Sequence, residues 1–222
     1  MGQGMEAMLT ADQANRRYFR EAYRSGLHGW AVEEPSAYAV HFLKRVQGLV
    51  AGGRLLDVGC GEGRHSIAAA QLGFRVVGVD YERLALKRAR RFASRKGVMG
   101  ITFREGNLFD LPFPEASFDV VLDYGCLHHQ RKGDWPAYKA AVLRVLRPEG
   151  FFVLSTFSRH FHMFRGSRRS WHIAHGAYRR CFSRKEIVGL FAREFAIMEI
   201  AEEREEVRGF WHVLMQRRAG IG

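Results

Sequence analysis

The sequence predicts an α/β protein built on a doubly wound, mainly parallel sheet. Short runs rich in Val, Leu, Ile and Phe alternate along the chain with longer segments whose apolar residues recur at helical spacing. A glycine-rich turn follows the first strand-like run, as in a strand–turn–helix unit. Because strand–helix–strand units cross over with a single hand, the alternation predicts helices on both faces of the sheet.

The N-terminal part of the chain is expected to be helical. One helix is predicted over 12–24 and a second over 36–50. In the second helix, Phe42, Leu43 and Val46 fall on one face, which should therefore point toward the core.

The middle of the chain supplies most of the sheet and its crossovers. Each strand is a short run of β-branched or aromatic residues, and the segments between the strands have helical periodicity. The predicted strands are 54–58, 74–79, 101–105, 118–123 and 151–156, and the predicted helices are 64–73, 82–96 and 134–147.

The C-terminal part begins with an irregular stretch over 158–182. Ser183 and Glu186 form a capping box at the start of a helix predicted over 184–193. Two closing strands, 195–200 and 207–216, are predicted to pair antiparallel around an acidic loop over 202–206.

The glycine-rich turn is the most informative segment of the chain. It reads Asp57-x-Gly59-x-Gly61-x-Gly63, and the next strand ends on Asp80. Glycines allow a tight turn and a close approach of backbone N–H groups to a ligand, and an acid at the next strand end can bind a ribose diol. A carboxylate at Asp57 would repel a pyrophosphate but favour a cationic ligand. S-adenosylmethionine, with its sulfonium and ammonium groups, suits this charge pattern.

With this turn, three further segments resemble the class I S-adenosylmethionine-dependent methyltransferases. They are 107–113, 117–123 and 145–152, and the resemblance as a whole covers about residues 35–158. It implies a Rossmann-like, doubly wound sheet of seven strands with the last strand antiparallel and helices on both faces. The amino-acid sequence of 123–129 is similar to that of small-molecule branches of the family. These branches include the thiopurine, tellurite-resistance and ubiquinone-biosynthesis relatives.

The resemblance also implies a set of cofactor-binding residues. The glycine turn would line the methionine end of S-adenosylmethionine, Asp80 would hold the ribose hydroxyls, and Tyr81 would pack on the adenine. Tyr81 and Leu108 could instead be ordinary core residues. The complete predicted set is Asp57, Gly59, Cys60, Gly61, Asp80, Tyr81, Asn107, Leu108, Asp123 and Tyr124.

Two adjacent histidines are the candidate catalytic residues. His128 and His129 follow the fourth predicted strand, and imidazole titrates near neutral pH, so either could act as a general base. At least one of them is more simply explained as a histidine at a helix start whose ring is satisfied by backbone groups. A metal site is not predicted, because the histidines have no partners at ligand spacing.

The segment 158–185 is rich in basic and aromatic residues and contains no acid. It would form the substrate cover, and it could face an anionic aromatic substrate, an RNA, or only solvent. The N-terminal residues Tyr18, Tyr23, Trp30 and His41 are expected to form the other half of the cover.

The bulk properties fit one domain. The chain has 222 residues and a formal net charge of +12, and its N-terminus has no hydrophobic signal core, so a soluble cytoplasmic protein is expected. Three scattered cysteines suggest neither disulfides nor zinc. The single domain 1–222 is divided into an N-terminal helical cover (1–50), a cofactor-binding core (51–157), a substrate-cover insertion (158–182) and a C-terminal helix with two strands (183–217).

The sequence therefore favours methyl transfer to a small-molecule acceptor. An RNA- or protein-modifying enzyme that uses 158–185 is the first alternative, although the Pro-Pro turn typical of base-modifying enzymes is lacking after Asp123. The second alternative is a methyltransferase fold that binds the cofactor without catalysis. No membrane insertion is expected.

Overall fold

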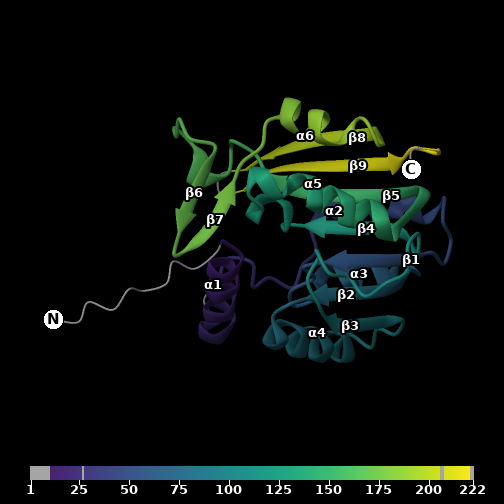
Figure 1. Ribbon diagram of the computed structural model, residues 1–222. Helices are drawn as coiled ribbons and strands as arrows, with labels where there is room; N and C mark the ends of the chain where they lie inside the picture. Colours follow the sequence, from purple (N-terminus) through teal and green to yellow (C-terminus); the bar gives the residue numbers. More distant parts are fainter. Residues whose placement is uncertain (1–10, 27, 206–207, 221–222) are drawn as a thin grey trace.

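A seven-stranded sheet forms the centre of the protein (Figure 1). The computed structural model describes residues 11–26, 28–205 and 208–220. In spatial order the strands are β3 (Ile101–Glu105), β2 (Arg75–Asp80), β1 (Arg54–Val58), β4 (Phe118–Tyr124), β5 (Leu146–Phe157), β9 (Gly209–Arg217) and β8 (Phe195–Arg204). Neighbouring strands from β3 to β5 are parallel, and β9 is antiparallel to both β5 and β8. This confirms the predicted Rossmann-like sheet with an antiparallel last strand.

Helices cover both faces of this sheet because successive strand residues point to opposite sides. In β1, Leu55 packs in one core cluster with α2 and α3, whereas Leu56 packs in another with α5 and α6. α4 covers Phe103 at the β3 edge. The helices are α2 (Ala37–Gln47), α3 (Arg64–Gln71), α4 (Arg83–Arg95), α5 (Trp135–Val145) and α6 (Arg184–Phe191).

Strand β5 begins earlier than the sequence predicts. The predicted helix 134–147 ends at Val145, because Leu146 already pairs with Phe118 of β4. Pro148 follows closely, and a proline disfavours helical backbone in the residue before it.

The segment 158–182 is not irregular, and that prediction was wrong. It contains a hairpin of β6 (Trp171–Ala174) and β7 (Ala177–Arg180). His175 and Gly176 between these strands both have positive φ, 51° and 79°, as a tight two-residue hairpin turn requires.

Helix α1 (Ala11–Ser25) lies beside this hairpin (Figure 1). Asn15 joins them: its side-chain oxygen accepts from the Tyr178 backbone N–H at 2.9 Å, and its amide donates to the His129 carbonyl at 3.1 Å. Within the segment 1–50 that was predicted as a cover, α1 thus lies at the hairpin, while α2 packs on the sheet.

The prediction of an acidic loop over 202–206 was also wrong for residues 202–204. Glu202, Glu203 and Arg204 belong to β8, and Glu203 pairs with Phe210 of β9. Residues 206–207 lie outside the described residues. No helix in the described ranges is both long and apolar enough to cross a membrane.

Candidate active site

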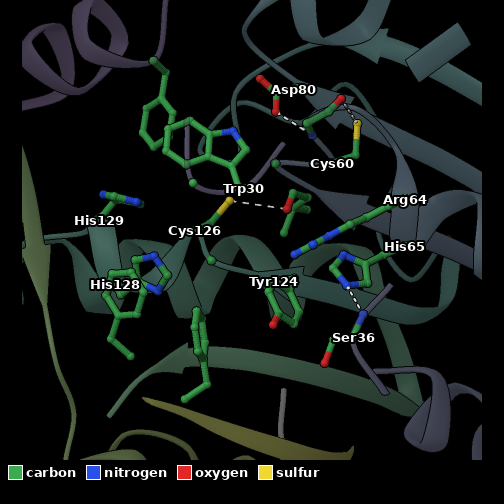
Figure 2. A pocket seen from close by; sticks show the side chains of 18 of the residues that line it. Trp30, Ser36, Cys60, Arg64, His65, Asp80, Tyr124, Cys126, His128 and His129 are labelled. Atoms are coloured by element: carbon green, nitrogen blue, oxygen red, sulfur yellow. Dashed lines mark hydrogen bonds between the residues drawn. The ribbon is translucent and has the colours of Figure 1, made fainter. Parts of the chain in front are cut away.

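A cavity of about 1100 Å³ lies at the carboxyl ends of the central strands and beneath α1 and the hairpin. Figure 2 shows Asp80 and Cys60 at one end of the labelled side chains, and Tyr124 and His65 away from them. Pockets for drug-sized ligands have volumes of roughly 300–1,000 Å³. The cavity therefore has room for a nucleoside-sized cofactor together with a small second molecule.

The glycine turn forms the wall of the cavity at the end of β1. Gly59 and Gly61 have φ of 65° and 55°, a conformation that side chains disfavour. A Cβ on Gly59 would also lie 2.2 Å from the Cys126 Sγ, and one on Gly61 would lie 2.8 Å from the Tyr23 hydroxyl. Only glycine fits these positions, so backbone rather than side chain faces the cavity.

Asp80, at the end of β2, holds this turn in place. One carboxylate oxygen accepts from the Gly61 N–H at 2.9 Å, and the other accepts from the Glu82 N–H at 2.8 Å. Burial raises the pKa of Asp80 to about 6, and the two backbone hydrogen bonds oppose that rise. A carboxylate has about four lone-pair positions, so Asp80 can still accept hydrogen bonds from a diol. The sequence did not reveal its second role in fixing the turn.

Asp57 lies beneath the same turn and also lines the cavity. Its carboxylate accepts from the Ser66 hydroxyl at 2.6 Å, and the residue is 2% exposed. Burial raises the pKa of Asp57 to about 7, the Ser66 hydrogen bond lowers it, and the charges of Asp123 and Asp80 raise it further. This arrangement would favour a positively charged ligand group, which stabilises the ionised form.

The remaining predicted residues of the cofactor end reach the cavity as well. Tyr81 lines the cavity, and its ring packs edge-on against the ring of Phe19, with 6.2 Å between the ring centres. Asn107 and Leu108 line it from the loop after β3, and the Asn107 side-chain oxygen accepts from the Phe109 N–H at 3.2 Å. Leu108 also packs in the hydrophobic core.

Asp123 was predicted to contact the cofactor, but the structure places it below the cavity wall. The residue is fully buried and does not line the cavity. It accepts from the backbone N–H groups of Cys126 (2.6 Å) and Leu127 (3.1 Å) and from the Tyr138 hydroxyl. Asp123 therefore fixes the turn that carries the two histidines.

Tyr124 does line the cavity, on a wall that α3 shares. Its ring stacks on the rings of His65 and Phe210, with distances of 4.3 Å and 5.5 Å between the ring centres. The Arg64 guanidinium lies 5.2 Å from the centre of the Tyr124 ring. The His65 Nε2 accepts from the Ser36 backbone N–H at 3.1 Å, which fixes that ring (Figure 2).

His128 and His129 both line the cavity from the turn after β4. The His129 Nδ1 lies 2.8 Å from the Tyr178 carbonyl, which can only accept, so this nitrogen carries the hydrogen. Burial lowers the pKa of His129 to about 4 and holds the pKa of His128 well below its usual value. Both rings are therefore neutral at neutral pH. The ring of His128 stacks on Phe157 at 3.6 Å, and its Nδ1 has no hydrogen-bond partner in the described ranges.

Helix α1 and the loop after it supply cavity residues, as expected for the cover. Tyr18, Tyr23 and Trp30 line the cavity, and the Trp30 indole N–H donates to the Tyr23 hydroxyl at 3.1 Å. His41 does not line it: this residue lies on α2, 3.6 Å from the Glu199 carboxylate. Sequence reasoning missed Phe19, although it belongs to the aromatic stretch of the predicted helix.

The arginines of 158–185 are largely occupied by contacts within the protein. Arg165 donates to the carbonyls of His160 and Glu205, and Arg180 pairs with Glu186. Arg179 is buried, donates to the Ala174 carbonyl and lies over the Tyr18 ring. The exposed basic residues of this segment are Arg159, Arg165, Arg168, Arg169, Arg184 and Lys185. Within the described residues, no cluster of three or more His, Cys, Asp or Glu side chains could hold a metal ion.

Comparisons with known proteins point to one family. Residues 55–150 match the family model described as a methyltransferase domain. A probable S-adenosylmethionine-dependent methyltransferase of Mycolicibacterium smegmatis is 37% identical over 109 residues, which are 49% of this chain and 40% of that protein. The 27-O-demethylrifamycin SV methyltransferase of Amycolatopsis mediterranei is 35% identical over 128 residues, 57% of this chain and 46% of that protein. The chain thus spans less than half the length of these relatives.

Among solved structures, the chain is similar to the 1,6-didemethyltoxoflavin-N1-methyltransferase of Burkholderia thailandensis. That structure holds 1,6-didemethyltoxoflavin and S-adenosylhomocysteine. The TM-score is 0.77 at 25% identity, and the match covers 96% of this chain and 93% of that one. Residues 55–150 thus match a methyltransferase domain, and the fold and the glycine turn with Asp80 make this chain similar to the class I S-adenosylmethionine-dependent methyltransferases.

Proposed function

We propose that the protein transfers a methyl group from S-adenosylmethionine to a small-molecule acceptor. The observation that carries this proposal is the cavity of about 1100 Å³, which joins the glycine turn to an aromatic end enclosed by α1 and the hairpin. The structure of the similar 1,6-didemethyltoxoflavin-N1-methyltransferase holds a small molecule, 1,6-didemethyltoxoflavin, together with S-adenosylhomocysteine. An enclosed cavity of this size suits such a pair better than it suits a polymer.

The residues at the glycine turn fit the proposed cofactor. Gly59, Cys60 and Gly61 would hold its methionine end, with the Asp57 charge close to the cationic groups. Asp80 would accept hydrogen bonds from the ribose hydroxyls, and Tyr81 and Leu108 would contact the adenine. The cofactor supplies a methyl group on a sulfonium, so the protein mainly has to align the acceptor and exclude water.

His128 is the better candidate for contact with the acceptor. The His129 ring is fixed by the Tyr178 carbonyl and by an edge contact with Phe19 at 4.9 Å. His128 lines the cavity, and burial disfavours its protonated form, so its ring would contact the acceptor in the neutral state. We propose His128 as the catalytic residue and His129 as its support.

Calorimetry should show micromolar binding of S-adenosylmethionine and S-adenosylhomocysteine and little binding of NAD. The physical reason is the buried carboxylate of Asp57 at the glycine turn. This carboxylate repels the pyrophosphate of NAD and attracts the cationic groups of S-adenosylmethionine. Tight binding of NAD, with no heat from either adenosyl ligand, would contradict the proposed function.

An RNA substrate is disfavoured by the internal contacts of the arginines, and this can be tested directly. Each phosphate that a protein neutralises releases counterions, so RNA binding should weaken steeply with salt. We expect no submicromolar RNA binding at physiological salt, either before or after Arg168, Arg169 and Arg184 are changed together to Ser. Submicromolar binding that the triple variant abolishes would instead support the RNA-modifying alternative.

A further inference from the structure

A buried carboxylate lines the cavity on the β8 side, away from the glycine turn. Glu203 is 8% exposed and lies next to the end of β8. Within the described ranges its hydrogen-bond partner is the His212 Nε2, at 3.3 Å, and no arginine or lysine there forms an ion pair with it. A buried carboxylate without a cationic partner is costly unless hydrogen-bond donors satisfy it.

His212 and Ser155 fix the orientation of this carboxylate. His212 lies on β9 and is fully buried, and its Nδ1 is 2.8 Å from the Ser155 hydroxyl. Its ring stacks on the ring of Tyr38, with 4.3 Å between the ring centres and an angle of 7° between the ring planes. Since a carboxylate can only accept, the His212 Nε2 carries a hydrogen toward Glu203, while Nδ1 is held by the Ser155 hydroxyl. Ser155 is itself buried and does not line the cavity, so this chain of groups ends at Glu203.

The surroundings of Glu203 are aromatic. Phe210 is its partner across the strands, and the ring of Phe210 stacks on Tyr124 at 5.5 Å. Both rings line the cavity, and so does Tyr38. Flat apolar walls beside one fixed polar group favour a planar ring that carries a hydrogen-bond donor.

We propose that Glu203 binds the methyl acceptor by accepting a hydrogen bond from an N–H or O–H group on a planar aromatic ring. His212 and Ser155 are positioning residues for this contact. The inference rests on the proposed function, because it assigns the acceptor end of the same cavity. An acceptor whose ring N–H or O–H is already methylated lacks the donor, so the site discriminates against it.

The test uses the whole chain saturated with S-adenosylhomocysteine and pairs of planar compounds that differ by one methyl group. Suitable pairs are indole with 1-methylindole, benzimidazole with 1-methylbenzimidazole, and 7-hydroxyquinoline with 7-methoxyquinoline. Their dissociation constants are measured by ligand-observed NMR. In at least one pair the N–H or O–H compound should bind about tenfold more tightly than its methylated partner, because the methylated compound cannot donate a hydrogen bond to the carboxylate.

Glu203→Gln should reduce this discrimination at least threefold, because the amide is a weaker acceptor than the carboxylate. His212→Gln should reduce it by a smaller factor. Glu202→Gln is the matched control: it removes the same charge from the neighbouring residue of β8, which pairs with Arg204 and does not line the cavity. This control should keep the discrimination unchanged.

The affinity for S-adenosylhomocysteine separates this inference from the proposed function. It should stay within twofold of the original value in all three variants, because Asp80 and the glycine turn are untouched. Loss of adenosyl binding in the unmodified chain would overturn the proposed function itself. Normal adenosyl binding without a discriminating pair, or with a pair that Glu203→Gln leaves unchanged, would overturn the assignment of Glu203.

Discussion

Asp80→Ala is expected to weaken the binding of S-adenosylmethionine by about 30- to 1,000-fold. Hydrogen bonds from a ribose diol to a carboxylate contribute roughly 1.5–3 kcal/mol each before losses to solvent, which leaves about 2–4 kcal/mol. The substitution also removes the acceptor for the Gly61 N–H and so frees the turn that should hold the methionine end. Isothermal calorimetry with S-adenosylhomocysteine measures the loss.

Two further variants make this result specific. Asp80→Asn keeps one acceptor oxygen but turns an N–H group toward a backbone donor, so its loss should be smaller than that of the alanine variant. Glu105→Ala is the matched control, since Glu105 ends the neighbouring strand β3, is exposed and pairs with Arg83. Unchanged affinity in Asp80→Ala, with the fold intact by circular dichroism, would show that the cofactor binds elsewhere.

The position of the glycine turn and Asp80 at one end of the cavity could be predicted from the sequence because these residues are close together in the chain. Asp57 and the glycines occupy one turn, and Asp80 ends the next strand, so local pattern and strand order were enough to place them. Parallel neighbours bring these ends to the same edge. The strand ranges were predictable for the same reason, since buried parallel strands are nearly continuous apolar runs.

Asp123 shows where this reasoning stops. An acid at the end of a buried strand looks the same in the sequence whether it faces a ligand or the turn below. The outcome depends on Tyr138, one helix later, and on the backbone N–H groups of Cys126 and Leu127, which all donate to Asp123. No local pattern contains that information.

The acceptor end depends on contacts between distant segments and was predicted least well. In the sequence Glu203 belongs to a run of acidic residues. Only the pairing of β8 with β9 brings its side chain to His212. The hairpin turn at His175 and Gly176 was missed because a histidine with positive φ is uncommon. α1 meets this hairpin through Asn15, an interaction across more than half of the chain.

Asp57→Asn is expected to stabilise the cofactor-free protein while weakening cofactor binding. In the folded state burial raises the pKa of Asp57 to about 7, against 3.8 for the unperturbed group. Between these values the unfolded chain releases its proton first, so the free energy of unfolding falls as the pH rises from about 4 to 7. Above pH 7 the ionised carboxylate destabilises the fold by roughly 4 kcal/mol on this basis. Asparagine avoids that charge and can still accept from the Ser66 hydroxyl, but its buried NH2 group needs a hydrogen-bond acceptor.

The net gain at pH 8 should therefore be on the order of 2 kcal/mol, which corresponds to a rise of roughly 4–8 °C in Tm for a chain of this size. The gain should shrink steadily toward pH 4, which is close to the unperturbed pKa of 3.8, because the unfolded chain is then also partly protonated at Asp57. Calorimetric scans of both proteins between pH 4 and pH 8 measure it, with the exposed Asp134→Asn as the matched control. Cofactor affinity at pH 8 should fall about tenfold in Asp57→Asn, because the amide no longer attracts the cationic end of the ligand. A Tm difference that does not vary with pH would show that Asp57 has the same pKa in the folded and unfolded states, so that burial does not raise it.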